Sequence, residues 1–221
     1  MLNQIGAVIA KDLLVEWRSP VRTTAVLFFA LAIVLLVAFS SGGGALKRQA
    51  ASTLWMGLLL ASTRSLDRSF QVELEQGALE GMVLWPVHPV ALFYGKAIAN
   101  TLVLWLVSLA ITPFVIAIFD APVKGNLPMF IGFLAVGCAA IAAPGTTFAA
   151  ITSRARAASA LLPVLLFPLV MPAMVASARG IGVLIEGDIM NQAPTWFGVV
   201  VAFAAVHWLF GPLFFRAVVE E

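Results

Sequence analysis

The chain has 221 residues, of which 62% are hydrophobic and only 11% are charged, and its mean hydropathy is +1.02. This balance excludes an ordinary soluble domain and predicts an all-α integral membrane protein, because a bilayer core of about 30 Å takes roughly 20 apolar residues per helix. The formal net charge is +2, we expect no nucleic-acid partner, and the single cysteine, Cys138, excludes an internal disulfide.

Residues 1–20 predict an amphipathic helix that lies on the membrane surface, because apolar and charged residues occupy different positions at helical spacing. The apolar set is Leu2, Ile5, Val8, Ile9, Leu13 and Trp17, and the charged set is Lys11, Asp12, Glu16 and Arg18. The segment has no short apolar stretch followed by a small-residue cleavage site, so we do not interpret it as a signal peptide. A frayed tail before the first membrane span is the alternative.

Six membrane-spanning helices are predicted in one permease domain, residues 1–221. They cover approximately residues 24–39, 50–62, 97–119, 127–151, 158–178 and 196–219. The second span is short and reaches full length only by extending at one or both ends. The fifth holds Pro163, Pro168 and Pro172. Because lipid cannot satisfy the carbonyl that a proline frees, we expect this helix to pack against protein or to line a cavity. Kinks that serve packing alone are the alternative to a transport role.

The distribution of lysine and arginine predicts the orientation. With the N-terminus in the cytoplasm, nine of the 13 cations lie on the cytoplasmic side and four on the opposite side. The nine are Lys11, Arg18, Arg22, Arg64, Arg68, Lys96, Arg154, Arg156 and Arg216, and the four are Lys47, Arg48, Lys124 and Arg179. We therefore expect both termini in the cytoplasm.

A charged island, residues 62–89, interrupts the apolar chain on the predicted cytoplasmic side. It holds six of the 24 charged residues, and no proline occurs in it before Pro86, so we expect a cytoplasmic helix over about residues 66–85. Its apolar positions Phe70, Leu74, Ala78 and Met82 share one face, and Glu73, Gln76 and Glu80 lie on another.

This pattern is typical of a helix that docks in a groove of a partner protein. A helix resting on the bilayer surface is the alternative. Residues 69–81 contain three glutamates and no lysine or arginine, however, whereas helices on anionic membranes are usually basic. The acidity favours a protein partner.

No catalytic or metal-binding pattern is present in the sequence. The phosphate loop GxxxxGK[ST] and the hydrolase motifs HExxH and GxSxG are absent, so we expect no enzyme activity and no directly bound cofactor or metal. His88, between two prolines, is interpreted as a turn residue. His207 lies within an apolar span, where an ionisable side chain suggests a function, although an interhelical hydrogen bond is the simpler interpretation. A haem site with two intramembrane histidines is not supported, because only His207 is inside a span.

The arrangement of an amphipathic helix, two spans, a charged cytoplasmic helix and four spans resembles ABC-2-type exporter permeases. Within that group, residues 65–100 resemble the signature of the haem exporter protein B (CcmB) family of cytochrome c maturation, and the opening residues 7–20 and residues 142–175 are also similar to that family. The residues that carry the signature are Leu66, Asp67, Arg68, Phe70, Glu73, Glu75, Gly77, Leu79, Glu80, Pro86 and Pro89. Residues 146–150 depart from the pattern, since we expect more glycine and serine there.

The resemblance implies a multi-pass permease of a bacterial or organellar inner membrane that works with a separate ABC ATPase (CcmA-like) and a haem-handling membrane protein (CcmC-like). ATP would act only through the partner, in release of the haem-loaded chaperone CcmE, and haem could reach this subunit. The ATPase-docking residues would be Asp67, Arg68, Phe70, Glu73, Glu75, Gly77, Leu79 and Glu80. A homodimer is a further expectation. A generic ABC-2 exporter of a lipid or drug, and a membrane scaffold without energy coupling, are the alternatives.

Overall fold

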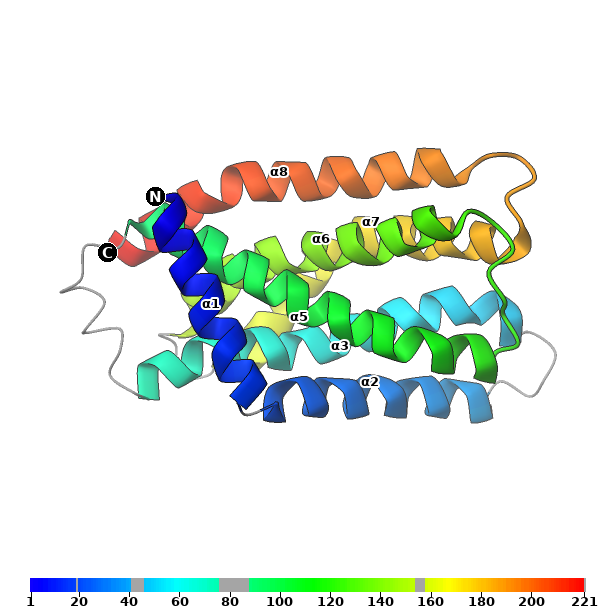
Figure 1. Ribbon diagram of the computed structural model, residues 1–221, viewed down its shortest axis with the longest axis horizontal. Coiled ribbons are helices and arrows are strands. Elements are labelled where there is room, and N and C mark those ends of the chain that lie inside the picture. The colour runs from blue at the N-terminus through cyan, green and yellow to red at the C-terminus, as the bar shows by residue number, and fades with distance from the viewer. Residues whose placement is uncertain (19, 41–45, 76–87, 154–157, 221) are drawn as a thin grey trace.

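The computed structural model describes residues 1–18, 20–40, 46–75, 88–153 and 158–220. Over these residues every regular element is an α-helix, which confirms the predicted all-α class. The helices are α1 (Leu2–Arg18), α2 (Val21–Ser40), α3 (Leu46–Glu75), α5 (Pro89–Ile118), α6 (Leu127–Ser153), α7 (Ala158–Glu186) and α8 (Ala193–Glu220). Figure 1 shows α2, α3 and α5 to α8 along the long axis of the molecule, with α1 crossing one end of the bundle.

Both chain termini lie at the same end of the bundle, which we call the terminal end (Figure 1). The last residues of α3 and α8 and the first residues of α5 are also there, while the links 119–126 and 187–192 lie at the opposite, distal end. Lys96 and Arg216 therefore lie at the terminal end, and Lys47 and Lys124 at the distal end. Among the described residues, the cations predicted to be cytoplasmic thus lie toward the terminal end, and those predicted for the opposite side lie toward the distal end.

Five of the described helices, α2, α5, α6, α7 and α8, are long and apolar enough to cross a membrane. The chain is accordingly a multi-pass membrane protein. The helices extend further than hydropathy predicts: α5 begins at Pro89 rather than near 97, and α7 continues to Glu186 rather than ending near 178. His88 caps α5, with its Nδ1 accepting from the Val90 N–H at 3.3 Å, and Pro89 occupies the first helical position, where a missing N–H costs little.

Helix α3 corrects the prediction of a short second span followed by a separate cytoplasmic helix. It is one helix of 30 residues, which at 1.5 Å per residue is about 45 Å long and exceeds a bilayer core of about 30 Å. No glycine or proline occurs between Gly57 and Gly77, so nothing in the local sequence breaks it. Residues 66–75 of the predicted coupling helix are thus the end of α3, and residues 76–85 lie outside the described part of the chain.

The prolines of α7 do not interrupt the helix. Leu162, Leu166 and Val170 are buried on its inner face, whereas Pro168 and Pro172 are exposed on the outer surface. The helix packs against protein as expected, but these two prolines do not face a cavity.

Helix α6 is at the centre of the bundle and contacts α3, α5, α7 and α8. Just over half of its membrane window, 56%, is buried, against 17% for α2 and 22% for α8, which lie outside. Close contact with α3 depends on Gly137, because a Cβ there would lie 2.1 Å from the Trp55 ring. Farther along both helices, Leu66 of α3 lies against Gly145 of α6, so the two helices run in parallel toward the terminal end.

Candidate functional site

The predicted docking residues begin where α3 extends past α2 at the terminal end. Ala30 of α2 packs on Gly57 of α3, and Val21, the first residue of α2, lies nine residues before Ala30. Because α2 and α3 run in opposite directions, α3 passes the start of α2 about nine residues after Gly57, near Leu66. At 1.5 Å per residue, the remaining nine residues, 67–75, extend about 14 Å farther. Figure 1 shows this end of α3 reaching past the start of α2.

Only part of the predicted docking set can be placed. Asp67 is half-buried near the start of the projecting part of α3. Arg68, Phe70, Glu73 and Glu75 follow on the same helix, although their side chains are not described. The positions of Gly77, Leu79 and Glu80 lie outside the described residues. The structure therefore places five of the eight positions on one continuous helix, and the docking role of the whole set stays a prediction.

The first turns of α5, which follow the charged island in sequence, contact three other helices. Phe93 packs against Phe215 of α8, with ring centroids 5.7 Å apart, and lies over Gly211. Tyr94 stacks on Trp208 of α8, and its hydroxyl donates to the Trp208 carbonyl at 3.1 Å.

The next residue, Gly95, supports α1. A Cβ at this position would lie 2.6 Å from the side chain of Val8, so only glycine lets α1 rest this closely on α5. Residues 93–96 of α5 are therefore in contact with α8 and α1, and through Lys96 with α3 as described next. We call these four residues the α5 junction.

Lys96 is the most unusual residue of the α5 junction, because its side chain is fully buried. Its Nζ donates to the backbone carbonyl of Ser69 on α3 at 3.1 Å and lies 3.6 Å from Oδ2 of Asp12 on α1. Burial of an ammonium group is costly unless it is paired and hydrogen-bonded, and here it has both kinds of partner. Lys96 therefore links three helices at the terminal end.

A polar interior continues from Lys96 along α5. One turn farther, Asn100 is buried, and its Nδ2 donates to Oγ1 of Thr146 on α6 at 3.1 Å. The facing part of α3 contributes the buried serines Ser62, Ser65 and Ser69. Thr146 lies in the stretch that departs from the expected glycine- and serine-rich pattern, and its hydroxyl serves as the acceptor for Asn100. The helices at the terminal end are joined by polar contacts as well as by apolar packing.

Helix α1 is ordered against the bundle, so a frayed tail at the N-terminus is excluded. Ile5, Val8, Ile9 and Leu13 from the predicted apolar face are half-buried. Leu2 and Trp17, assigned to the same face, are instead 83% and 87% exposed. The apolar face is thus divided between contact with protein and the outer surface.

A carboxylate fixes the turn from α1 into α2. Glu16 Oε1 accepts hydrogen bonds from the backbone N–H of Thr23, at 2.8 Å, and from its hydroxyl. Thr23 is in the first turn of α2, where amide groups lack helical acceptors and a negative charge is favourable. The angle between the two helices is therefore set by a specific contact.

His207 is partly buried on α8 and does not make the predicted interhelical hydrogen bond through Nδ1. This nitrogen lies 2.9 Å from the Phe203 carbonyl on the same helix, and the imidazole stacks on the Phe203 ring at 4.2 Å. Since a carbonyl only accepts, Nδ1 is the donor in this bond. The prediction of an interhelical bond is wrong for Nδ1, because the carbonyl of Phe203, four residues earlier on the same helix, is already within hydrogen-bonding distance.

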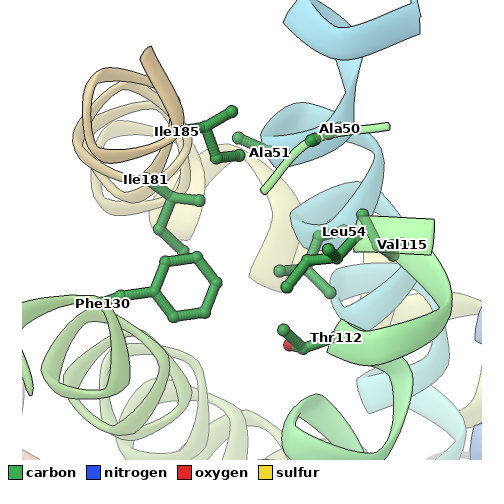
Figure 2. Close-up of a pocket in the computed structure, with 10 residues that line it drawn as sticks. Ala50, Ala51, Leu54, Thr112, Val115, Phe130, Ile181 and Ile185 are labelled. Carbon is green, nitrogen blue, oxygen red and sulfur yellow. The ribbon is translucent and has the colours of Figure 1, made fainter. Parts of the chain in front are cut away.

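Figure 2 shows a cavity near the distal end, lined by α3, α5, α6 and α7 and by the start of the link after α5. It has a volume of about 10 Å³, which is no more than a single water needs and far below the roughly 300–1,000 Å³ of ligand pockets. Its lining is apolar except for Thr112, and consists of Ala50, Ala51, Leu54, Thr112, Val115, Ile116, Ala121, Phe130, Ile181 and Ile185. The cavity is a packing gap and not a site for a large ligand.

Sequence reasoning missed Lys96 and Asp12 as site residues. Hydropathy puts Lys96 just outside the third span, which is predicted to begin near residue 97, and Asp12 belongs to the charged positions of the predicted surface helix. A lysine within a long apolar helix is a functional candidate by default, and extending that helix to Pro89 would have identified it.

Comparison with known proteins covers nearly the whole chain. The model of the family described as "CcmB protein" matches residues 3–221. The chain is 32% identical to "Heme exporter protein B" of Rhodobacter capsulatus over 175 residues, which is 78% of this chain and 80% of the relative. Proteins of the same name from Paracoccus denitrificans (32% over 185 residues, 79% and 81%) and Bradyrhizobium diazoefficiens (26% over 213 residues, 96% and 95%) are also similar.

Proposed function

Because this chain belongs to the CcmB family, we propose that it is the membrane-spanning permease subunit of a haem-exporting ABC transporter for cytochrome c maturation. The observation that carries the proposal is the match of the family model over residues 3–221, together with relatives named for haem export. The subunit itself is not an enzyme in this proposal. Its role is to change shape when a partner hydrolyses ATP.

The ATPase is a separate subunit in this proposal, since the sequence has no phosphate-binding loop. The projecting end of α3 and the acidic residues that follow it dock in a groove of that ATPase. Two features support this assignment: α3 extends about 14 Å past the start of α2, and residues 69–81 carry three glutamates without a lysine or arginine. The projecting helix offers a partner a surface to bind, and its glutamates fix the position of the helix in the groove.

A displacement of the docked segment would reach the membrane helices directly. The segment connects α3 to α5, and each of these helices has 30 residues. A helix is stiff along its axis, so a push at the terminal end tilts α3 and α5 against α6. The ATP-bound and ATP-free partner would then favour different tilts, which is how a partner biases a two-state element.

The membrane arrangement completes the proposal. Helix α3 serves as the sixth span, both termini are cytoplasmic, α1 lies at the surface of a bacterial or organellar inner membrane, and a CcmC-like haem-handling protein is a further partner. The cavity of about 10 Å³ is far too small for haem. Because six helices seldom enclose a pathway alone, the haem path in this proposal forms between this chain and a second copy or another subunit, with release of a haem-loaded chaperone as its outcome.

Charge reversal in the docking segment tests the ATPase assignment. Glu73→Lys, and more strongly Glu73→Lys with Glu80→Lys, should reduce co-purification of the ATPase subunit about tenfold or more, because like charges then face each other across the contact. Glu186→Lys makes the same change in charge as the single variant at the distal end and should leave co-purification unchanged. Normal ATPase recovery with the double variant, in membranes that contain normal amounts of the chain, would refute the docking segment.

Deletion of the chain tests the haem assignment separately. Holo-cytochrome c, measured by haem-stained gels, should be lost in the deletion strain and restored by the wild-type chain. Normal holo-cytochrome c after deletion would refute the role in cytochrome c maturation and favour an exporter of another substrate.

A further inference from the structure

The buried amine of Lys96 makes two contacts of different kinds with two helices. On α3 it meets the carbonyl of Ser69, three residues beyond Leu66, where α3 has just passed the start of α2. On α1 it meets Asp12, whose side chain is only 15% exposed. Both contacts lie within the first two turns of α5, directly after the charged island.

These contacts resist separation of the helices more strongly than apolar packing does. Moving the end of α3 or α1 away from α5 would take the Ser69 carbonyl or the Asp12 carboxylate away from a buried ammonium group, which is costly. Apolar side chains can slide past each other at small cost, whereas a carbonyl and a carboxylate fix both distance and direction. The three helices are thus held in one arrangement.

We propose that Lys96 is a positioning residue that makes α1 and the projecting end of α3 move as one body with the start of α5. A displacement of the ATPase-docking segment then reaches the surface helix α1 as well as the membrane spans. The source of that displacement rests on the proposed function, but the connection among the three helices does not.

The connection continues from α1 into α2. Glu16 at the end of α1 accepts two hydrogen bonds from Thr23 in the first turn of α2. Helix α2 is the least buried of the candidate spans, at 17%, and its inner face packs on α3 and α5, so a movement of α3 also reaches it directly. The path therefore leads from α3 through Lys96 to α1, and from α1 to the outermost span.

Cysteine labelling tests the connection without reference to transport. Val8→Cys, in a Cys138→Ser background, places a thiol where α1 covers Gly95, and its maleimide labelling rate in membranes reports release of α1. Lys96→Met should raise that rate on the order of tenfold. Breaking a buried ion pair costs at least the free energy that corresponds to a tenfold change in an equilibrium. Asp12→Asn should raise it less, and Lys124→Met, at the distal end, should not change it.

An unchanged labelling rate in both Lys96→Met and Asp12→Asn would overturn the proposal. If Lys96→Met does not accumulate in membranes, Asp12→Asn alone decides, because it removes the charge with little change in shape. Deletion of the chain with normal holo-cytochrome c would refute the proposed function and leave this labelling result valid.

ATP hydrolysis by the complete complex separates positioning from simple structural support. In Lys96→Met we expect the ATPase subunit to co-purify in its normal ratio with an unchanged KM for ATP, while kcat and holo-cytochrome c fall about tenfold. Lys96→Arg should recover part of kcat, since arginine can also meet a carboxylate and a carbonyl. Normal kcat in Lys96→Met, or loss of the ATPase subunit from the complex, would overturn a positioning role.

Discussion

The contact between Gly137 of α6 and Trp55 of α3 gives a quantitative test of the packing that holds α3 in place. A Cβ at residue 137 would lie 2.1 Å from Cη2, 2.7 Å from Cζ2 and 2.9 Å from Cζ3 of the Trp55 ring, whereas ordinary contacts begin at 3.4 Å. The ring or the helix that carries it would have to move by about 1.3 Å to restore an ordinary contact. Trp55 is only 2% exposed, so it has little free space to enter.

Gly137→Ala should therefore destabilise the protein despite the better helix propensity of alanine. A contact this short calls for the upper part of the usual overpacking cost, about 2–3 kcal/mol, and the propensity gain returns about 0.5–1 kcal/mol, which leaves a net loss of about 1–2.5 kcal/mol. Trp55→Phe alone should cost about 1–2 kcal/mol through the space it leaves. It breaks no hydrogen bond within the described residues, because the Trp55 Nε1 has no acceptor among them.

The double variant carries the decisive information. Phenylalanine lacks the outer ring atoms that the new Cβ would meet, so Trp55→Phe with Gly137→Ala should be more stable than the sum of the single changes by about 1 kcal/mol or more. The assay is thermal loss of helical circular dichroism in detergent, which does not depend on tryptophan fluorescence. Gly182→Ala, at a position with nothing within 4 Å of the added Cβ, should be neutral or slightly stabilising. Additive effects, or a Gly137→Ala protein as stable as the wild type, would refute the reasoning.

Two further contacts give predictions of smaller size. Glu16→Ala removes the acceptor of two hydrogen bonds from Thr23 and should destabilise the start of α2 by about 1 kcal/mol. Hydrogen exchange measured by mass spectrometry should then be faster for the amides of this turn, and unchanged exchange would contradict a capping role. Tyr94→Phe removes the bond to the Trp208 carbonyl and should cost about 0.5–1.5 kcal/mol, while Tyr94→Leu should lose the ring stacking in addition; equal melting temperatures for the two variants would contradict that order.

Apolar composition was sufficient to predict the helices but not where they end. Hydropathy placed the start of the third span after Lys96 and the end of the second span at Ser62, because a charged or polar residue lowers the local average. In the folded chain Lys96 meets Asp12 and Ser69, so its charge does not need water. Residues of this kind can lie inside a helix only when another helix supplies their partners, and that information is not local in sequence.

The ATPase-docking site stays a prediction, although five of its eight positions lie on the described part of α3. The charged island does begin on a helix that projects at the terminal end, and Asp67 lies near the base of that projection. Lys96 and Asp12, which connect this helix to α1, are separated by 84 positions in the chain, and no local pattern pairs them. His207 attracted notice because it is ionisable, yet its Nδ1 is paired within α8.

The sequence by itself determined that the chain is helical and apolar, that its positive charges fall into two groups, and that its charged island is acidic. Each of these properties depends on the residue types alone or on their spacing along one helix. Only the tertiary structure decided that α3 continues into the first part of the island as far as Glu75, that α1 rests on Gly95, and that Lys96 is buried among three helices. The physical reason is that helical periodicity shows which face of a helix is buried, while the identity of the facing helix depends on shape and on polar partners distant in sequence.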